Sequence, residues 1–116
     1  MLRVASTLLI LGVAAGGALA AGSSAPFGYT PDPLLRTASV TDLQSRVRDA
    51  CASTQARLQS STPVAMARPC SCYAGRVMRT LDAGEVAAYR TTGVFNDTAR
   101  TKALAALDQC KLRRPV

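Results

Sequence analysis

Residues 69–81 read PCSCYAGRVMRTL, and the two cysteines in this stretch, Cys70 and Cys72, decide how the chain folds. Two further cysteines, Cys51 and Cys110, lie on either side of it. An even number of cysteines in a short chain that enters an oxidising compartment is normally a set of disulfides. A bridge from Cys70 to Cys72 is disfavoured because helical side chains two positions apart diverge by about 200°. The sequence therefore predicts either Cys51–Cys70 with Cys72–Cys110 or Cys51–Cys72 with Cys70–Cys110.

The Cys70-Ser71-Cys72 spacing is also compatible with more specialised chemistry. A Cys-x-Cys pair can bind Cu(I) or exchange thiols, and a position at a helix N-terminus lowers the pKa of a thiol. Met66 and Met78 are the other soft ligands nearby, and no strand–helix pattern of the thioredoxin kind is present. We therefore interpret the four cysteines as structural, expect no cofactor and no metal, and keep a thiol-redox or copper-handling role as an alternative.

Helical periodicity extends on both sides of the cysteines. Thr41-Asp42-Leu43-Gln44 has the form of a capping box, which predicts a first helix that ends at residues 60–63. A loop to Pro69 and a second helix from Pro69 are expected next. The residues predicted to face inward are Leu43, Val47, Ala50, Cys51, Thr54 and Leu58 in the first helix and Cys70, Ala74, Val77 and Leu81 in the second, with Tyr73 and Met78 at the edges and Arg76 and Arg79 pointing away.

Two shorter helices are predicted after the second. Asp82, with Glu85 three residues later, predicts a third helix through Arg90 that ends before Gly93. Asn96 or Asp97 caps a fourth helix, which ends before Pro115. The inward residues of these helices are predicted to be Val86 and Tyr89 in the third and Ala99, Ala103, Ala106, Leu107 and Cys110 in the fourth.

These elements predict an all-α fold: a small disulfide-stapled bundle of three to four short helices over residues 40–114. Aromatic residues make up 4% of the chain, with no Trp, so alanine and leucine must fill most of the interior. Each disulfide is expected to contribute about 2 to 4 kcal/mol, which is a large share of the stability of so small a domain.

The amino-terminal segment is typical of a signal peptide. Met1-Leu2-Arg3 gives a positive start, and Val4–Ala20 is uncharged and closes with small residues. We expect residues 1–20 to be removed by cleavage after Ala20 or Ala21, and the product to be periplasmic or secreted. The alternative is an inner-membrane anchor formed by Val4–Ala20, which the glycines in its second half weaken.

Residues 21–39 form a Pro/Gly-rich segment between this leader and the helices. Its prolines and glycines predict a flexible arm without helix or packed strand. Two of the five aromatic residues of the chain, Phe27 and Tyr29, lie in it. The simpler expectation is that they pack back on the domain or are disordered, and the alternative is that they contact a partner.

Composition argues against most enzyme classes. The chain has no His and a single Glu, Glu85, and its Asp residues are scattered singly. The commonest general base and the paired carboxylates of acid–base catalysis are therefore missing, and we expect no catalytic residues and no enzyme activity. The formal net charge is +7, but the cations are spread along the chain rather than clustered.

Three functions remain after these exclusions. The leading hypothesis is a non-catalytic exported protein that binds another protein, as an accessory subunit or an inhibitor. The second is the thiol-redox or copper-handling role of Cys70 and Cys72. The third is binding of anionic surfaces, with Lys111, Arg113 and Arg114 at the carboxyl end as the candidate contacts. No nucleic-acid-binding motif is visible, so nucleic acid is not an expected partner.

Overall fold

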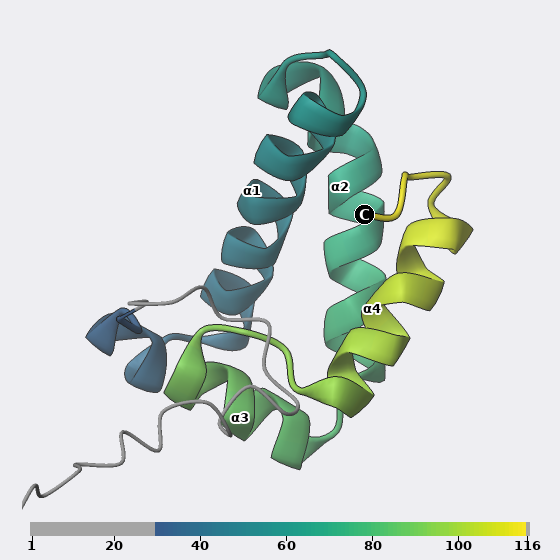
Figure 1. The fold of residues 1–116 in the computed structure, drawn as a ribbon. Coiled ribbons are helices and arrows are strands. Elements are labelled where there is room, and N and C mark those ends of the chain that lie inside the picture. The colour runs from purple at the N-terminus through teal and green to yellow at the C-terminus, as the bar shows by residue number, and fades with distance from the viewer. Residues whose placement is uncertain (1–29, 116) are drawn as a thin grey trace, which may run out of the picture.

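The computed structural model describes residues 30–115, which form helices joined by short connections (Figure 1). The predicted signal peptide and residues 21–29 of the predicted arm lie outside this range. The prediction of an all-α bundle held by disulfides is confirmed. In chain order the elements are the short 3-10 helix η2 (Pro33–Thr37) and the α-helices α1 (Val40–Leu58), α2 (Pro63–Thr80), α3 (Ala83–Thr92) and α4 (Asp97–Gln109).

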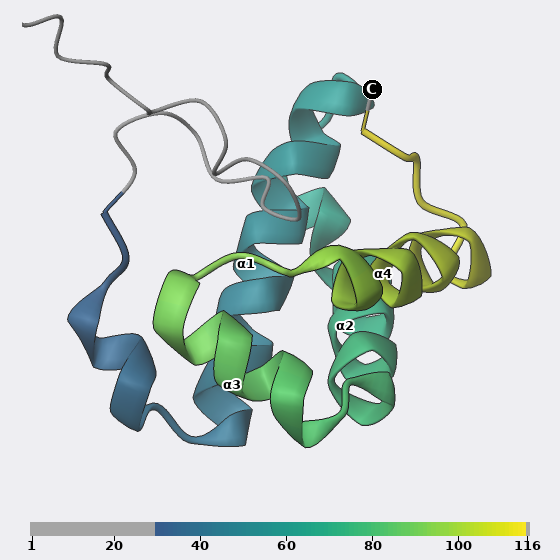
Figure 2. The same ribbon diagram turned by 60° about the horizontal axis from the view of Figure 1, so that its bottom comes forward.

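Helix α2 is the centre of the arrangement. It packs along α1 as an antiparallel hairpin, and α4 packs on it as well. Helix α3 lies across the end of the bundle, where it contacts η2 (Figures 1 and 2). Helices α1 and α4 thus share α2 as a neighbour but make little contact with each other.

Helix α1 begins earlier than predicted. Its N-cap is Ser39, whose hydroxyl accepts a hydrogen bond from the backbone N–H of Asp42 at 3.0 Å. The predicted capping box of Thr41 and Gln44 is therefore wrong. Ser39 places Asp42 in the first helical turn, where its charge complements the helix dipole, and this explains the earlier start.

Helix α2 also begins before its predicted position. Pro63 occupies its first turn, and the Thr62 hydroxyl accepts from the backbone N–H of Ala65 at 3.2 Å. The predicted loop to Pro69 is wrong, because Pro69 lies inside the helix. A proline there leaves one carbonyl without its helical donor. The packing of α2 on α1 and the disulfide at the next residue, Cys70, hold this turn in place.

Part of the predicted arm is folded. Pro33–Thr37 form η2, so the expectation of no helix before Thr37 is wrong for these residues. Asp32 caps η2 by accepting from the backbone N–H of Leu34 at 2.9 Å, and its carboxylate also pairs with Arg46 of α1. Leu35 is buried in the core, which anchors the segment to the bundle.

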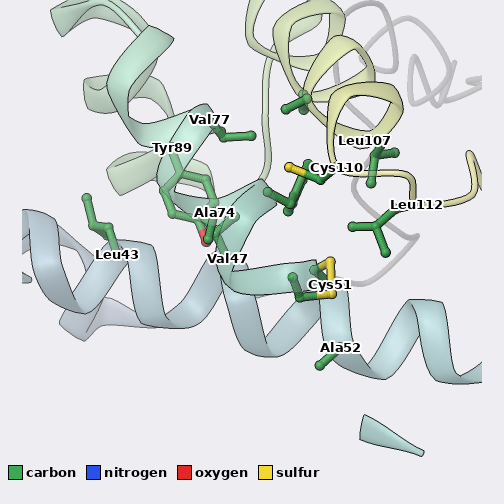
Figure 3. Packing of buried hydrophobic residues seen from close by; sticks show 14 of the residues in the cluster. Leu43, Val47, Cys51, Ala52, Ala74, Val77, Tyr89, Leu107, Cys110 and Leu112 are labelled. Carbon is green, nitrogen blue, oxygen red and sulfur yellow. A yellow bond between two sulfur atoms is a disulfide. The ribbon is translucent and has the colours of Figure 1, made fainter. Parts of the chain in front are cut away.

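The core is built mainly from small and aliphatic side chains of α1, α2 and α4, together with Leu35 of η2 and the tyrosines Tyr73 and Tyr89 (Figure 3). The predicted inward face of α4 is confirmed, since all five of its residues are buried. On α1, Leu43, Val47 and Cys51 are buried as predicted, but Ala50 is exposed and Thr54 is half-buried. The buried face of α1 is instead completed by Ala52, Gln55 and Ala56, so the helix is turned relative to the prediction.

Two disulfides join the three helices of the core. Cys51 pairs with Cys70 and links α1 to α2, whereas Cys72 pairs with Cys110 and links α2 to the end of α4. The first of the two predicted pairings is therefore the correct one. Disulfides of this kind indicate an oxidising, extracytoplasmic environment. Within residues 30–115, no helix is both long enough and apolar enough to cross a bilayer.

Glu85 connects α3 to α4. It forms a capping box with the predicted N-cap Asp82, since its Oε1 accepts from the backbone N–H of Asp82 at 2.8 Å and its own N–H donates to the Asp82 side chain at 2.8 Å. The same Oε1 lies 2.5 Å from the Nζ of Lys102 in α4. Its Oε2 is buried with no hydrogen-bond partner among the described residues, so Oε1 carries these contacts.

Replacing Glu85 by Gln is expected to make stability less sensitive to acid. Lys102, and then the backbone N–H of Asp82, lower the pKa of Glu85 from 4.5 to about 2. Between these values the folded protein binds fewer protons than the unfolded chain, so stability falls as the pH falls. Urea unfolding midpoints should therefore decline less steeply for E85Q than for the parent between pH 4.5 and about 2. Asp49→Asn, at an exposed carboxylate on α1, is the control, and a parent-like slope for E85Q would contradict this assignment.

Candidate functional site

The candidate functional site is an open groove of about 650 Å³ between α1 and α4. One wall is α1 and the other is α4, and α2 and α3 contribute tyrosines between them. The connection between α3 and α4 lines one end, and the carboxyl-terminal tail lines the other. The groove exists because both walls pack on α2 rather than on each other.

Both walls present side chains at helical spacing. The α1 wall includes Val47, Ala50, Cys51 and Thr54, and the α4 wall includes Arg100, Ala103, Leu104 and Leu107. Each set follows the i, i+3, i+4, i+7 pattern of one helix face, which covers about 10 Å along the axis. Ala50 and Thr54 were predicted to face the core, and they line this groove instead.

Aromatic rings line the groove near the α3–α4 connection. The rings of Tyr89 and Phe95 lie 5.2 Å apart between centroids, which is close enough for a favourable aromatic contact. Tyr73 of α2 is 9% exposed, and burial, with a smaller effect of Tyr89, raises the pKa of Tyr73 to about 12. A tyrosine is protonated at neutral pH even at its ordinary pKa, and this shift extends that state further into the alkaline range. The Tyr73 hydroxyl forms no hydrogen bond with another described residue and can donate one to an occupant of the groove.

Among the described residues that line the groove, one side chain, that of Arg100, is charged. Arg100 of α4 is exposed and forms no ion pair with another described residue. Asp and Glu side chains do not contribute to the described lining. The electrostatic character of this apolar surface is therefore set by one cation.

Gln55 fixes the end of the groove that is nearest to the carboxyl terminus. It is 1% exposed, and its Nε2 donates to the carbonyl oxygen of Arg113 at 2.7 Å. The backbone N–H of Arg113 donates back to its Oε1 at 3.1 Å. These two bonds hold the tail against α1, and Pro115 then lines the groove. Gln55 was not among the residues predicted from the sequence to face inward or to form a site. The signal that could have identified it is its position four residues after Cys51, which places a polar side chain on the buried face of the helix.

The predicted anion contacts do not form one cluster. Arg114 pairs with Asp108, with Nη2 and Oδ2 2.5 Å apart, and Arg113 donates from Nη1 to the carbonyl oxygen of Leu58 at 3.3 Å. Lys111 is exposed in the left-handed backbone conformation that follows α4. Two of the three side chains therefore have partners within the chain, and anion binding by this set stays a prediction.

The cysteines of the Cys-x-Cys motif belong to different bridges. Cys70 is bonded to α1 and Cys72 to the end of α4, so none of the four cysteines of the chain is free. Within residues 30–115 there is no group of three or more His, Cys, Asp or Glu side chains placed to hold a metal ion. In this disulfide-bonded form, Cys70 and Cys72 do not offer a pair of thiols.

Comparisons with protein-family models, with curated proteins and with solved structures found no match to this chain. The residues and geometry described above are therefore the basis for assigning a function. Among the described features, the groove between α1 and α4 combines volume, apolar lining and an unpaired charge in one place.

Proposed function

We propose that this chain is an exported, non-catalytic protein that binds another protein through the groove between α1 and α4. The observation that carries the proposal is a groove between two helices, lined mainly by apolar side chains and open to solvent along Ala50 and Arg100. Concave, mostly apolar sites with a few polar groups are where proteins commonly bind their ligands. A groove between two helices is also a common way of receiving a segment of a partner.

The chemistry of the groove supports binding rather than catalysis. Its lining residues are mostly aliphatic or aromatic, and the hydroxyl of Tyr73 is held in its neutral form. The chain has no His, and its only Glu is engaged by Lys102 outside this lining. The groove thus offers contact area and one cation, and it offers no general base paired with a nucleophile.

The proposed location is the periplasm or the cell exterior. The disulfides support passage through an oxidising compartment, and the signal-like sequence of residues 1–20 gives the route. In this proposal the leader is removed after Ala20 or Ala21. The protein then folds around the two bridges and presents the groove to its partner.

Site-specific photo-crosslinking in the organism that encodes the chain tests this function. A photoreactive residue at Ala50, which is exposed in the α1 wall, is expected to give a discrete adduct with one protein. The matched control is the same residue at Val64, which is 86% exposed in the first turn of α2 and outside the groove lining. An adduct from position 50 alone supports the proposal. The absence of an adduct from position 50, or equal adducts from both positions, would refute it.

A further inference from the structure

We propose that the occupant of the groove is an amphipathic helix of the partner protein, which places apolar side chains between α1 and α4 and a carboxylate against Arg100. This inference rests on the proposed function and specifies the chemistry of the partner. It is carried by two independent features of the same surface: the spacing of the two walls, and the single unpaired charge in the lining.

The arrangement of the walls favours a helix as the occupant. Helices α1 and α4 run in the same direction along the groove, since Gln55 and Leu107 both lie towards the end where the tail is held. Each wall presents about two turns of side chains. A helix laid between them would contact both walls and complete a bundle around α2, burying side chains at its own i, i+3, i+4 and i+7 positions.

The charge of the groove selects for an acidic helix. Arg100 lies about two turns before Leu107 on α4, at the end of the groove near Phe95. An occupant that covers this end removes water from the guanidinium, which then needs an acceptor. A carboxylate supplies that acceptor, whereas a lysine or arginine at the same position would be repelled because no acidic side chain lines the described groove.

Tyr73 provides a second polar contact to the occupant. It is nine-tenths buried, it lines the groove, and its hydroxyl has no hydrogen-bond partner among the described residues. Because its phenol remains neutral at physiological pH, it is a donor for an uncharged or anionic acceptor. The groove therefore combines an apolar surface with two donors, and this combination fits a helix that carries one acid among apolar residues.

A displayed peptide library tests this inference directly. The probe is a set of helical peptides of about 14 residues, in which the positions on one face are randomised and the others are fixed as alanine and glutamine. The bait is the disulfide-bonded chain without the proposed leader, residues 21–116. Parallel selections use Arg100→Glu, in which the charge of the groove is reversed, and Arg76→Gln, in which an exposed arginine of α2 outside the groove is neutralised. Selected peptides are remeasured by fluorescence anisotropy against each bait.

The expected result is that the charge selected in the peptides reverses when the charge at position 100 of the groove is reversed. The parent and Arg76→Gln should enrich Leu, Ile, Met or Phe at helical spacing together with one Asp or Glu, and Arg100→Glu should enrich Lys or Arg in place of the acid. An acidic peptide should bind Arg100→Gln roughly fivefold more weakly than the parent, which is typical of one partly exposed ion pair. An Ala50→Arg substitution, which fills the groove, should abolish binding of the selected peptides.

Other outcomes overturn the inference. Apolar enrichment without an acid would remove the role of Arg100, and binding of dodecanoate to the groove in place of any helix would make the ligand a small apolar acid. Much tighter peptide binding after deletion of residues 21–29 would make that segment of the chain the occupant. Failure of every peptide, with the discrete crosslink from position 50 still present, would refute the helix and leave the proposed function standing. Loss of both would refute the two together.

Discussion

Replacing Cys72 and Cys110 together by alanine is expected to lower the free energy of unfolding by about 4 kcal/mol. The bridge closes a loop with a sequence separation of 38, and its removal returns that conformational freedom to the unfolded chain. The folded chain also loses the covalent link between α2 and the end of α4. Urea unfolding without reductant, followed by far-UV circular dichroism, measures the change.

The matched comparison is the double substitution Cys51→Ala with Cys70→Ala. This bridge closes a loop with a separation of 19, for which the same entropic model gives about 3 kcal/mol. The longer loop should therefore be the costlier one to open. A loss below about 1 kcal/mol for the Cys72 and Cys110 variant would contradict a structural role for that bridge.

The bridge between Cys72 and Cys110 also matters for the groove. Helix α4 provides one wall, but it is held to α2 rather than to α1. Opening the bridge frees the end of α4 next to Leu107. In the proposed binding role, the Cys72–Cys110 bridge holds α4 on α2 and so keeps α4 at a fixed distance from α1. The bridge does this without filling the groove between α1 and α4.

Sequence reasoning predicted the parts of this fold that local signals determine. The four cysteines limited the pairing to two arrangements, and the repeat of Ala99, Ala103 and Ala106 identified the buried face of α4 correctly. The capping box of Asp82 and Glu85 placed the start of α3. Each of these signals depends on chemistry within a few residues or on a fixed helical period.

Two of the errors, the predicted starts of α1 and α2, arose where two residues close in sequence carried the same signal. Ser39 and Thr41 are both good N-caps, and Pro63 and Pro69 both suit a first helical turn. The structure begins α1 after Ser39 and α2 at Pro63, where the hydroxyls of Ser39 and Thr62 each accept a backbone hydrogen bond from the first turn. Residues 63–68, which this start adds to α2, are exposed except for the partly buried Met66, so burial does not explain the choice.

The groove could not be predicted from the sequence for a different reason. Periodicity shows that Ala50 and Thr54 lie near the apolar face of α1, but it does not show which element covers them. Coverage depends on where α4 packs, and α4 packs on α2. The contacts of Gln55 with Arg113 and of Glu85 with Lys102 are likewise long-range, so they become visible only in the folded chain.

Leu43→Ala is expected to destabilise the chain by about 3 kcal/mol, within the range for a buried leucine truncated to alanine. Leu43 is 0% exposed and lies in the core cluster with Val47 and Val77 (Figure 3). Two phenylalanines and no tryptophan occur in the whole chain, so few bulky side chains are present that could relax into the cavity. Leu34→Ala, at a leucine that is 68% exposed on η2, is the control and should change stability by less than about 0.5 kcal/mol. Equal effects of the two substitutions in urea unfolding would mean that the bridges, rather than the aliphatic core, carry the stability of the bundle.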